Sequence, residues 1–192
     1  MEKNTHHYCF NSFFGERMKK KLVIIGAGGY GQTVADIAHQ ENEYEEILFL
    51  DDNRELLDRN ISAGICSNYV NYKDAWVYPA FGNNENRMRW IEALLSGGYQ
   101  VPTIIHESAY VSPRATVGIG TIVLPKAVIN TDTKVGKGCI INCGSMIDHG
   151  CVIEDGCHIC LGAVVKAENR IRSKTKIDSG EVIEARSCPV NT

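Results

Sequence analysis

The sequence predicts two structural units in one chain, an α/β unit in the first half and a parallel β-helix in the second. Two observations carry this prediction. A glycine-rich turn between an apolar run and an amphipathic segment opens the first half, and a six-residue repeat of Ile or Val runs without interruption through the second. The 192 residues suffice for one ordinary domain or two small ones packed together.

Composition narrows the class of protein. With 44% apolar residues, 22% charged residues and a formal net charge of −3, the chain resembles a folded, mildly acidic protein, which argues against nucleic acid as a partner. No stretch approaches the roughly 18 consecutive apolar residues of a membrane span, and residues 1–18 lack the apolar stretch of a signal peptide. We therefore expect a cytoplasmic protein without membrane insertion, free thiols at its eight cysteines, and a disordered N-terminal extension over residues 1–18.

The first half alternates strands and helices. The apolar run KLVIIG is followed by a glycine turn and then by a helix that has Val34, Ile37 and Ala38 on one face. The segments ILFLDD and WVYPAFGNN read as a second and a third strand, each ending in polar residues. This alternation is typical of a parallel sheet, and residues 19–104 have room for one Rossmann-like βαβαβ half-unit rather than a complete dinucleotide fold.

A further helix follows the third predicted strand. Asn83 or Asn84 can cap its N-terminus, and Gly97-Gly98 ends it. Its apolar positions predict one buried face. They are Met88, Ile91, Leu94 and Leu95.

The six-residue repeat occupies residues 105–188. Each Ile or Val is expected to fill the interior of a β-helix, and a small residue four positions later is expected to fit a corner. The charged stretch from Lys166 to Arg186, where Asn169 and Glu181 replace small residues, resembles a polar terminal cap. The repeating positions are Ile105, Val111, Val117, Val123, Ile129, Val135, Ile141, Ile147, Ile153, Ile159, Val165, Ile171, Ile177 and Ile183.

The glycine turn fits a nucleotide-binding pattern. Gly26, Gly28 and Gly31 match G-x-G-x-x-G between a strand and a helix, and Asp51 and Asp52 follow at the end of the next strand. Such glycines let the backbone approach a phosphate, and the acid can accept hydrogen bonds from a ribose or a base. The missing second half argues against an NAD-dependent dehydrogenase and favours a single nucleotide. A glycine turn kept only for tight packing is the alternative.

A second polar turn lies at the same edge of the predicted sheet. Gly82-Asn83-Asn84 follows the third strand, and the carboxyl ends of parallel strands are where ligands of open sheets bind. We expect ligand contact at this turn, with a simple connecting turn as the alternative.

The β-helix offers one candidate for proton transfer. Asp148 and His149 follow the interior residue Ile147, which places His149 on the outer wall, where it can take a proton at neutral pH. An inert surface histidine is the alternative. Cys157 and Cys160 form a C-x-x-C pair, but Cys157 occupies a small-residue position, so the pattern favours packing over metal or redox chemistry.

These motifs together resemble a known family. VIIGAGGYG, FLDD, FGNNENR and MIDHGCVIEDGCHICLGA occur in the order found in bacterial sugar acetyltransferases of the NeuD/PglD type, and the resemblance covers residues 19 to 165. It implies a homotrimer of left-handed β-helices that uses acetyl-CoA and no metal. The implied acceptor is a UDP-linked amino sugar of surface-glycan synthesis or, as an alternative, a sialic acid acetylated on oxygen.

The resemblance also implies roles for individual residues. His149 would be the general base with Asp148 beside it, in a site between neighbouring subunits. His158 and Gly162 would lie at acetyl-CoA, and Asn142 would line the acceptor sugar. The residues implied to hold the nucleotide are Gly28, Gly29, Tyr30, Asp51, Asp52 and Asn83.

The chain departs from the family at three places. Gly150 follows the histidine where relatives often carry an acid, so the orientation of His149 falls to Asp148 or to another residue. Tyr30 stands where the glycine loop often has histidine. The charged coils after Lys166 replace glycine-rich coils that help to hold coenzyme A, so the remaining alternative is a non-catalytic nucleotide-sugar-binding homologue with an incomplete coenzyme A site.

Overall fold

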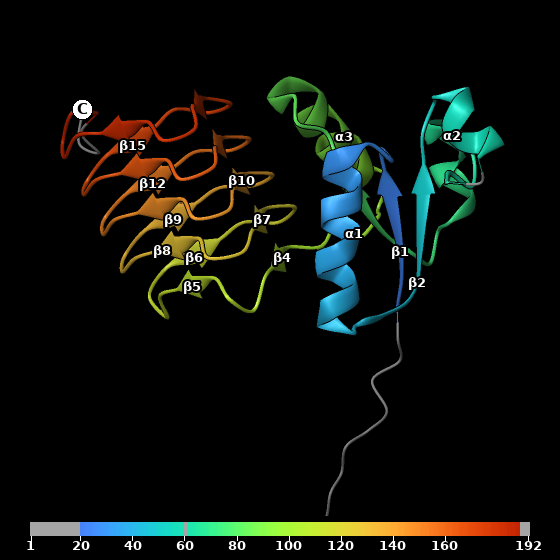
Figure 1. The fold of residues 1–192 in the computed structure, drawn as a ribbon, viewed down its shortest axis with the longest axis horizontal. Helices are drawn as coiled ribbons and strands as arrows, with labels where there is room; N and C mark the ends of the chain where they lie inside the picture. The colour runs from blue at the N-terminus through green and yellow to red at the C-terminus, as the bar shows by residue number, and fades with distance from the viewer. Residues whose placement is uncertain (1–19, 60, 189–192) are drawn as a thin grey trace, which may run out of the picture.

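The two predicted units are both present and stand side by side (Figure 1). The computed structural model describes residues 20–59 and 61–188, so the extension expected over residues 1–18 lies outside the described part of the chain. Within those two ranges, no helix has the length and apolar character needed to cross a membrane.

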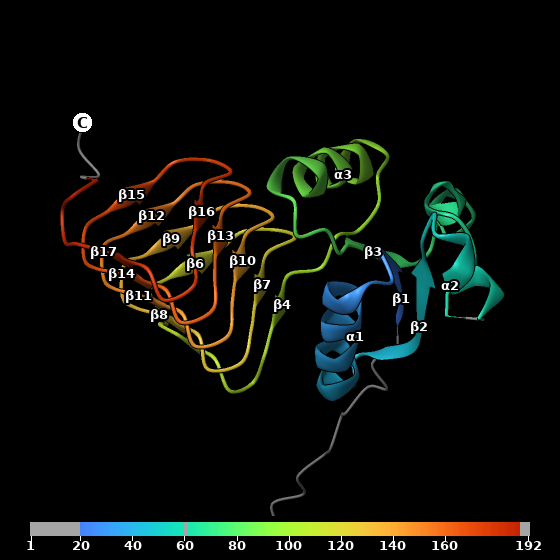
Figure 2. The ribbon, with the colours of Figure 1, turned by 45° about the horizontal axis from the view of Figure 1, so that its top comes forward.

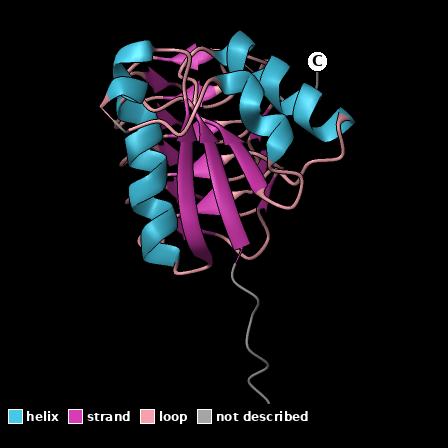
Figure 3. Ribbon diagram, turned by 90° about the vertical axis from the view of Figure 1, so that its right-hand side faces the viewer, coloured by secondary structure: helices cyan, strands magenta, loops and turns pink. Residues whose placement is uncertain are grey.

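The α/β unit is built on a three-stranded parallel sheet with the strand order β2-β1-β3. Helices cover both of its faces (Figure 3). Its elements are β1 (Lys20–Ile25), α1 (Gly29–Glu41), β2 (Tyr44–Leu50), α2 (Arg54–Asp58), the 3-10 helix η1 (Cys66–Asn71), β3 (Trp76–Pro79) and α3 (Asn84–Ser96).

The central strand β1 is buried on both faces, as its unbroken apolar run predicts. Leu22 and Ile24 pack with α1, whereas Val23 and Ile25 point to the opposite face and pack with α3. The predicted inner face of α1 is confirmed, because Val34, Ile37 and Ala38 are all buried.

Helix α3 begins as predicted, because the side chain of Asn83 accepts a hydrogen bond from the backbone N–H of Asn86 at 2.9 Å. Met88, Ile91 and Leu94 are buried, as expected. The expectation for Leu95 is wrong, because this side chain is 37% exposed. The corner glycines of the β-helix approach Met88 and Ile91, whereas Leu95 is the last residue but one of α3.

The β-helix consists of fourteen two-residue strands in three parallel sheets. From Val111 onward, the second residue of each strand joins one apolar core together with small corner residues, as the repeat predicts. The expectation for Ile105 is wrong, because this residue is 36% exposed on the edge strand of its sheet, where no earlier coil covers it. The strands of the first sheet are β4 (Ile104–Ile105), β7 (Ile122–Val123), β10 (Ile140–Ile141), β13 (His158–Ile159) and β16 (Lys176–Ile177). Those of the second are β5 (Tyr110–Val111), β8 (Val128–Ile129), β11 (Met146–Ile147), β14 (Val164–Val165) and β17 (Val182–Ile183). Those of the third are β6 (Thr116–Val117), β9 (Lys134–Val135), β12 (Val152–Ile153) and β15 (Arg170–Ile171).

The first sheet of the β-helix is covered by the α/β unit. Its outward residues Ile104, Ile122 and Ile140 join one buried cluster with α1 and Tyr78, and Figure 2 shows α1 beside β4 and β7. Apolar burial of this kind stabilises an interface by roughly 25 cal/mol per Å². The two units therefore share a core and hold each other in place.

Helix α3 packs on one corner of the β-helix, which requires glycine there. A Cβ atom at Gly138 would lie 2.6 Å from side-chain atoms of Met88 and Ile91, and one at Gly156 would lie 2.5 Å from Met88. Both glycines also have positive φ, at 61° and 73°. The corner glycines of successive coils thus admit α3, which brings the polar turn before α3 against the β-helix.

Candidate functional site

The glycine turn between β1 and α1 leaves backbone N–H groups open at the start of a helix. Gly28 is the N-cap of α1, and no side chain caps it. Gly28 and Gly29 are exposed, and a Cβ atom at either would meet nothing within 4 Å. A helix start of this kind attracts the charge of a phosphate group.

Gly31 is the glycine of this turn at which an added Cβ atom would meet the closest backbone contact. A Cβ atom there would lie 2.0 Å from the carbonyl oxygen of Gly26, whose own φ is 103°. We expect Gly31→Ala to lower the free energy of unfolding by about 2 kcal/mol or more, because backbone must move to admit the methyl group. Gly29→Ala is the matched control, and we expect it to raise the free energy of unfolding by about 0.5 kcal/mol. Chemical denaturation measures both, and equal effects would contradict the packing argument.

Asp51 and Asp52 brace the loops at this edge of the sheet. The two carboxylate oxygens of Asp51 accept hydrogen bonds from the backbone N–H groups of Ala27 at 2.8 Å and Asn53 at 2.9 Å. Asp52 accepts one from the N–H of Cys66 at 2.9 Å. The structure therefore ties Asp51 directly to the glycine turn, an internal role that the sequence does not reveal.

Tyr30 turns its hydroxyl into the protein. Its oxygen lies 3.0 Å from that of Tyr78, which comes from β3. Burial raises the pKa of both phenols, that of Tyr78 to about 12, so the pair is neutral. At the neighbouring strand end, Asn83 uses its side-chain oxygen to cap α3.

Arg87 is a buried residue of this region that the sequence analysis missed. It is fully buried between α3 and the β-helix, and its guanidinium donates to the carbonyl oxygens of Gly138 at 2.7 Å and Gly156 at 2.9 Å. The same group donates to the carbonyl of Phe81 and to the side chain of Asn84, both at 2.9 Å. Arg87 thus joins the polar turn after β3 to two coils of the β-helix.

His158 and Asn142 form a pair at the edge of the covered sheet. Nδ2 of Asn142 lies 3.1 Å from Nε2 of His158, while Oδ1 of Asn142 accepts from the N–H of Cys143. With that oxygen engaged, the amide nitrogen faces the ring, so Nε2 accepts and Nδ1 carries the proton. Burial, with the positive charges of Arg87 and Lys176, lowers the pKa of His158 to about 4, so the ring is neutral at physiological pH.

Gly162 adjoins this pair. Its backbone N–H donates to the carbonyl oxygen of Cys143 at 3.1 Å, and its φ is 63°. The structure therefore brings together Asn142, His158 and Gly162, which the sequence analysis linked to the acceptor and to acetyl-CoA.

His149 lies elsewhere, on the corner between β11 and β12. It is exposed, and its backbone N–H donates to Oδ1 of Asp148 at 2.7 Å. That oxygen also accepts from Nδ2 of Asn130 at 3.3 Å. The strands β11 and β13 belong to different sheets of the prism (Figure 2). Because His158 lies on β13 and His149 follows β11, one chain presents the two histidines on different sides.

The cysteine pair has the packing role that its position in the repeat predicts. Cys157 and Cys160 are both buried, and the thiol of Cys157 approaches the carbonyl oxygen of Arg172 at 3.0 Å. All seven cysteines of residues 20–59 and 61–188 are free thiols. In the same ranges, the His, Cys, Asp and Glu side chains form no group of three or more that could hold a metal ion.

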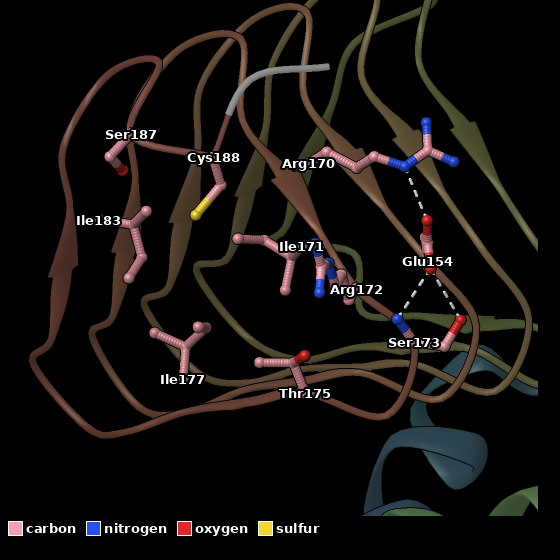
Figure 4. Close-up of a pocket in the computed structure, with 10 residues that line it drawn as sticks. All are labelled: Glu154, Arg170, Ile171, Arg172, Ser173, Thr175, Ile177, Ile183, Ser187 and Cys188. Carbon is pink, nitrogen blue, oxygen red and sulfur yellow. Dashed lines mark hydrogen bonds and ion pairs between the residues drawn. The ribbon is translucent and has the colours of Figure 1, made fainter. Parts of the chain in front are cut away.

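A pocket of about 810 Å³ lies at the last coils of the β-helix (Figure 4). Ile171, Ile177 and Ile183 point into it from the interior of the prism, and on its rim the carboxylate of Glu154 accepts hydrogen bonds from Arg170 and Ser173. Neither His149 nor His158 lines this pocket.

Comparison with known proteins places both units in one family. Residues 21–94 match the family model described as the PglD N-terminal domain. Over 111 residues the chain is 27% identical to UDP-N-acetylbacillosamine N-acetyltransferase of Bacillus subtilis (strain 168), an alignment covering 55% of this chain and about half, 51%, of that relative.

Solved structures match both units together. The acetyltransferase domain of PglB from Neisseria gonorrhoeae FA1090 is 30% identical, with a TM-score of 0.81 over 88% of this chain and 84% of that one. Its complex with acetyl coenzyme A matches with a TM-score of 0.80 over 88% and 83% of the two chains, also at 30% identity. A mutant of perosamine N-acetyltransferase from Caulobacter crescentus, in complex with CoA and GDP-perosamine, shares the fold at 23% identity, with a TM-score of 0.71 over 86% and 89%.

These matches agree with the glycine turn, the polar edge of the sheet and the histidine-bearing β-helix described above. The match to the PglD N-terminal domain and the likeness to PglB across the β-helix together show that the chain belongs to the NeuD/PglD-type sugar acetyltransferases.

Proposed function

We propose that the protein transfers the acetyl group of acetyl-CoA to the amine of a UDP-linked amino sugar. The observation that carries the proposal is the likeness to the PglB acetyltransferase domain bound to acetyl coenzyme A, which extends over both units of the chain. The relative from Bacillus subtilis, named for a UDP-linked sugar, supports the choice of nucleotide.

His149 acts in this reaction as the general base. It removes a proton as the sugar amine attacks the thioester carbonyl, so that a C–N bond forms, the C–S bond breaks and the proton passes to the departing thiolate. The exposed position of His149 on its corner gives a substrate access to the ring. Transfer is direct and requires no covalent intermediate on the protein.

His158 and Asn142 position the acetyl donor and the acceptor. Because the ring of His158 is neutral, with its Nε2 paired to Asn142, the Nδ1–H is a donor for a carbonyl oxygen. Gly162 lies in the adjoining turn, where acetyl-CoA would pass. The nucleotide lies at the exposed start of α1, near Gly28, Gly29 and Tyr30, with Asp51, Asp52 and Asn83 at the same edge of the sheet.

The active protein is a homotrimer in which His149 of one chain completes the site of its neighbour. The three faces of the prism differ: the α/β unit covers the first, and the third presents residues such as Lys134 and Arg170. The second carries an apolar strip, the outward residues of its five strands. They are Tyr110, Val128, Met146, Val164 and Val182, of which Tyr110, Met146 and Val182 are about half exposed. Burying such a strip favours association, and His149 lies two residues after the end of β11, at the edge of the strip.

Met146→Glu should convert the trimer into inactive monomers, because the variant places a charge in the centre of the apolar strip, where burying it costs several kcal/mol. Light scattering after gel filtration measures the oligomeric state, and release of coenzyme A measures turnover. Thr116→Glu is the matched control, since it adds the same charge to an exposed position on the third face and should leave the trimer intact. A Met146→Glu protein that remains trimeric would exclude this face as the interface.

The activity is tested by thiol release from acetyl-CoA with a panel of UDP-4-amino sugars and sialic acids. Release with a UDP-amino sugar supports the proposal. Release with sialic acid alone would assign O-acetylation instead. Failure both to bind acetyl-CoA and to turn over any acceptor would contradict the enzymatic function and leave a nucleotide-sugar-binding protein.

A further inference from the structure

The corner that carries His149 has a column of charged side chains with one gap. At this corner each coil contributes a residue to the column, and ion pairs join neighbouring coils. Arg114 pairs with Asp132 at 2.8 Å, and Arg186 pairs with Glu168 at 2.7 Å. Gly150, directly after His149, has no side chain and separates the two pairs. The column consists of Arg114, Asp132, Gly150, Glu168 and Arg186, spaced eighteen residues apart.

Glu168 reaches over this gap from the coil above. Its backbone N–H donates to the carbonyl oxygen of His149 at 3.1 Å, so the two residues are joined directly. A Cβ atom at Gly150 would lie 3.4 Å from Cγ of Glu168, and among the described residues outside the immediate chain neighbours no other atom lies within 4 Å of that point. The stem of Glu168 therefore lies beside the place where a side chain following His149 would start.

The Glu168 carboxylate is held ionised and in place. Arg186 donates to its two oxygens at 2.7 Å and 2.9 Å. These hydrogen bonds keep the pKa of the Glu168 carboxyl below its ordinary value, and the nearby charge of His149 acts in the same direction. Each carboxylate oxygen has a second lone pair, so Glu168 can accept an imidazole N–H without releasing Arg186.

We propose that Glu168 is the acidic positioning residue of His149, supplied by the coil above instead of by the next residue in the sequence. The inference rests on the proposed function, in which His149 is the general base. Glu168 accepts a hydrogen bond from one ring nitrogen of His149 and so directs the other nitrogen toward the acceptor. Its negative charge also stabilises the imidazolium that forms when His149 takes the proton.

Glu168 is paired with an arginine, as other charged groups around His149 are paired. Its place at the gap distinguishes it, because no atom of those other groups lies within 4 Å of the Cβ position of Gly150. Asp148 accepts from the backbone of His149 and from Asn130. Lys166, in the coil above Asp148, pairs with Glu184 at 2.7 Å. In the coil below, Asp132 pairs with Arg114, and none of its atoms approaches the Gly150 gap within 4 Å. Glu168 is thus the carboxylate that best fits the gap.

Glu168→Gln in the full-length protein tests the inference by two independent measurements. We expect kcat to fall about tenfold, and the acid limb of the kcat/KM profile to move to lower pH by about half a unit, because the amide no longer stabilises a protonated base. The titration midpoint of the His149 imidazole, followed by NMR and assigned with His149→Ala, should move by a similar amount in the same direction. The NMR measurement requires no turnover, so it tests the Glu168–His149 coupling even if the proposed function fails.

Asp132→Asn is the matched control, because it removes a carboxylate paired to arginine at the same corner, one coil below His149. We expect it to leave the acid limb and the imidazole titration unchanged. An unchanged titration in Glu168→Gln would overturn the inference, and so would a shift that occurs in Asp132→Asn instead. A general loss of stability would not move the imidazole titration, which separates positioning from a purely structural role.

Discussion

His149→Ala is expected to reduce turnover by roughly 10²- to 10⁴-fold, the usual contribution of a general base. The residue is exposed and belongs to none of the three buried apolar clusters, so the fold should be unaffected. The assay is coenzyme A release at saturating acetyl-CoA and acceptor, with the oligomeric state measured on the same sample.

His39→Ala provides the control, because His39 is an exposed histidine at the end of α1, away from the β-helix corner. That variant should turn over at the wild-type rate. If His149→Ala retained wild-type turnover as a trimer, another group would have to serve as the base, and the inference about Glu168 would lose its catalytic consequence while its NMR test remained valid.

Arg87→Met is expected to lower the free energy of unfolding by about 2–5 kcal/mol, because it removes several buried hydrogen bonds that a charged group donates to neutral oxygens. Methionine approximates the aliphatic stem, so the loss comes mainly from the hydrogen bonds. The carbonyl oxygens of Gly138 and Gly156 would remain buried without the donors that Arg87 now supplies. Each unsatisfied buried polar group costs about 1–3 kcal/mol.

Urea denaturation measures this effect, with Arg89→Met as the control. Arg89 lies two residues further along α3, is exposed and donates to Asn86, so its replacement should change the free energy of unfolding by no more than about 0.5 kcal/mol. Equal stability of the two variants would show that the contacts of Arg87 with the β-helix do not hold the units together.

A second consequence of Arg87→Met concerns His158. The positive charge of Arg87 contributes to the lowered pKa of this histidine, after burial. Its removal should move the pKa of His158 back toward the ordinary value. The same arginine therefore links the stability of the interface to the neutral state of a ring in the proposed site.

Much of the fold could be predicted from local sequence. The six-residue repeat specifies strand, corner and interior positions within each coil. These positions can therefore be assigned without knowing which distant residues come into contact. The start of α3 could be predicted for the same reason, because Asn83 caps the helix by accepting a hydrogen bond from Asn86, only three positions away.

The sequence indicated which residues belong to the candidate site but not which hydrogen bonds they make. Asp51 and Tyr30 were expected to hold a nucleotide, and the structure adds internal contacts that the sequence did not suggest: Asp51 braces the glycine turn and the hydroxyl of Tyr30 meets that of Tyr78. Arg87 was missed because arginine is rarely buried, although it lies four and seven residues before Ile91 and Leu94 on the inward stripe of α3. That spacing was the available signal.

Local sequence was sufficient to specify the two units, their order and the positions of the histidines along the repeat, because these depend on periodicities of a few residues. Tertiary structure alone decided that Arg87 is buried against Gly138 and Gly156, that His158 is neutral, and that Glu168 lies over the gap at Gly150. These three features depend on contacts between residues far apart in the sequence or in different coils. Such contacts exist only once the coils have stacked and α3 has packed against their corners.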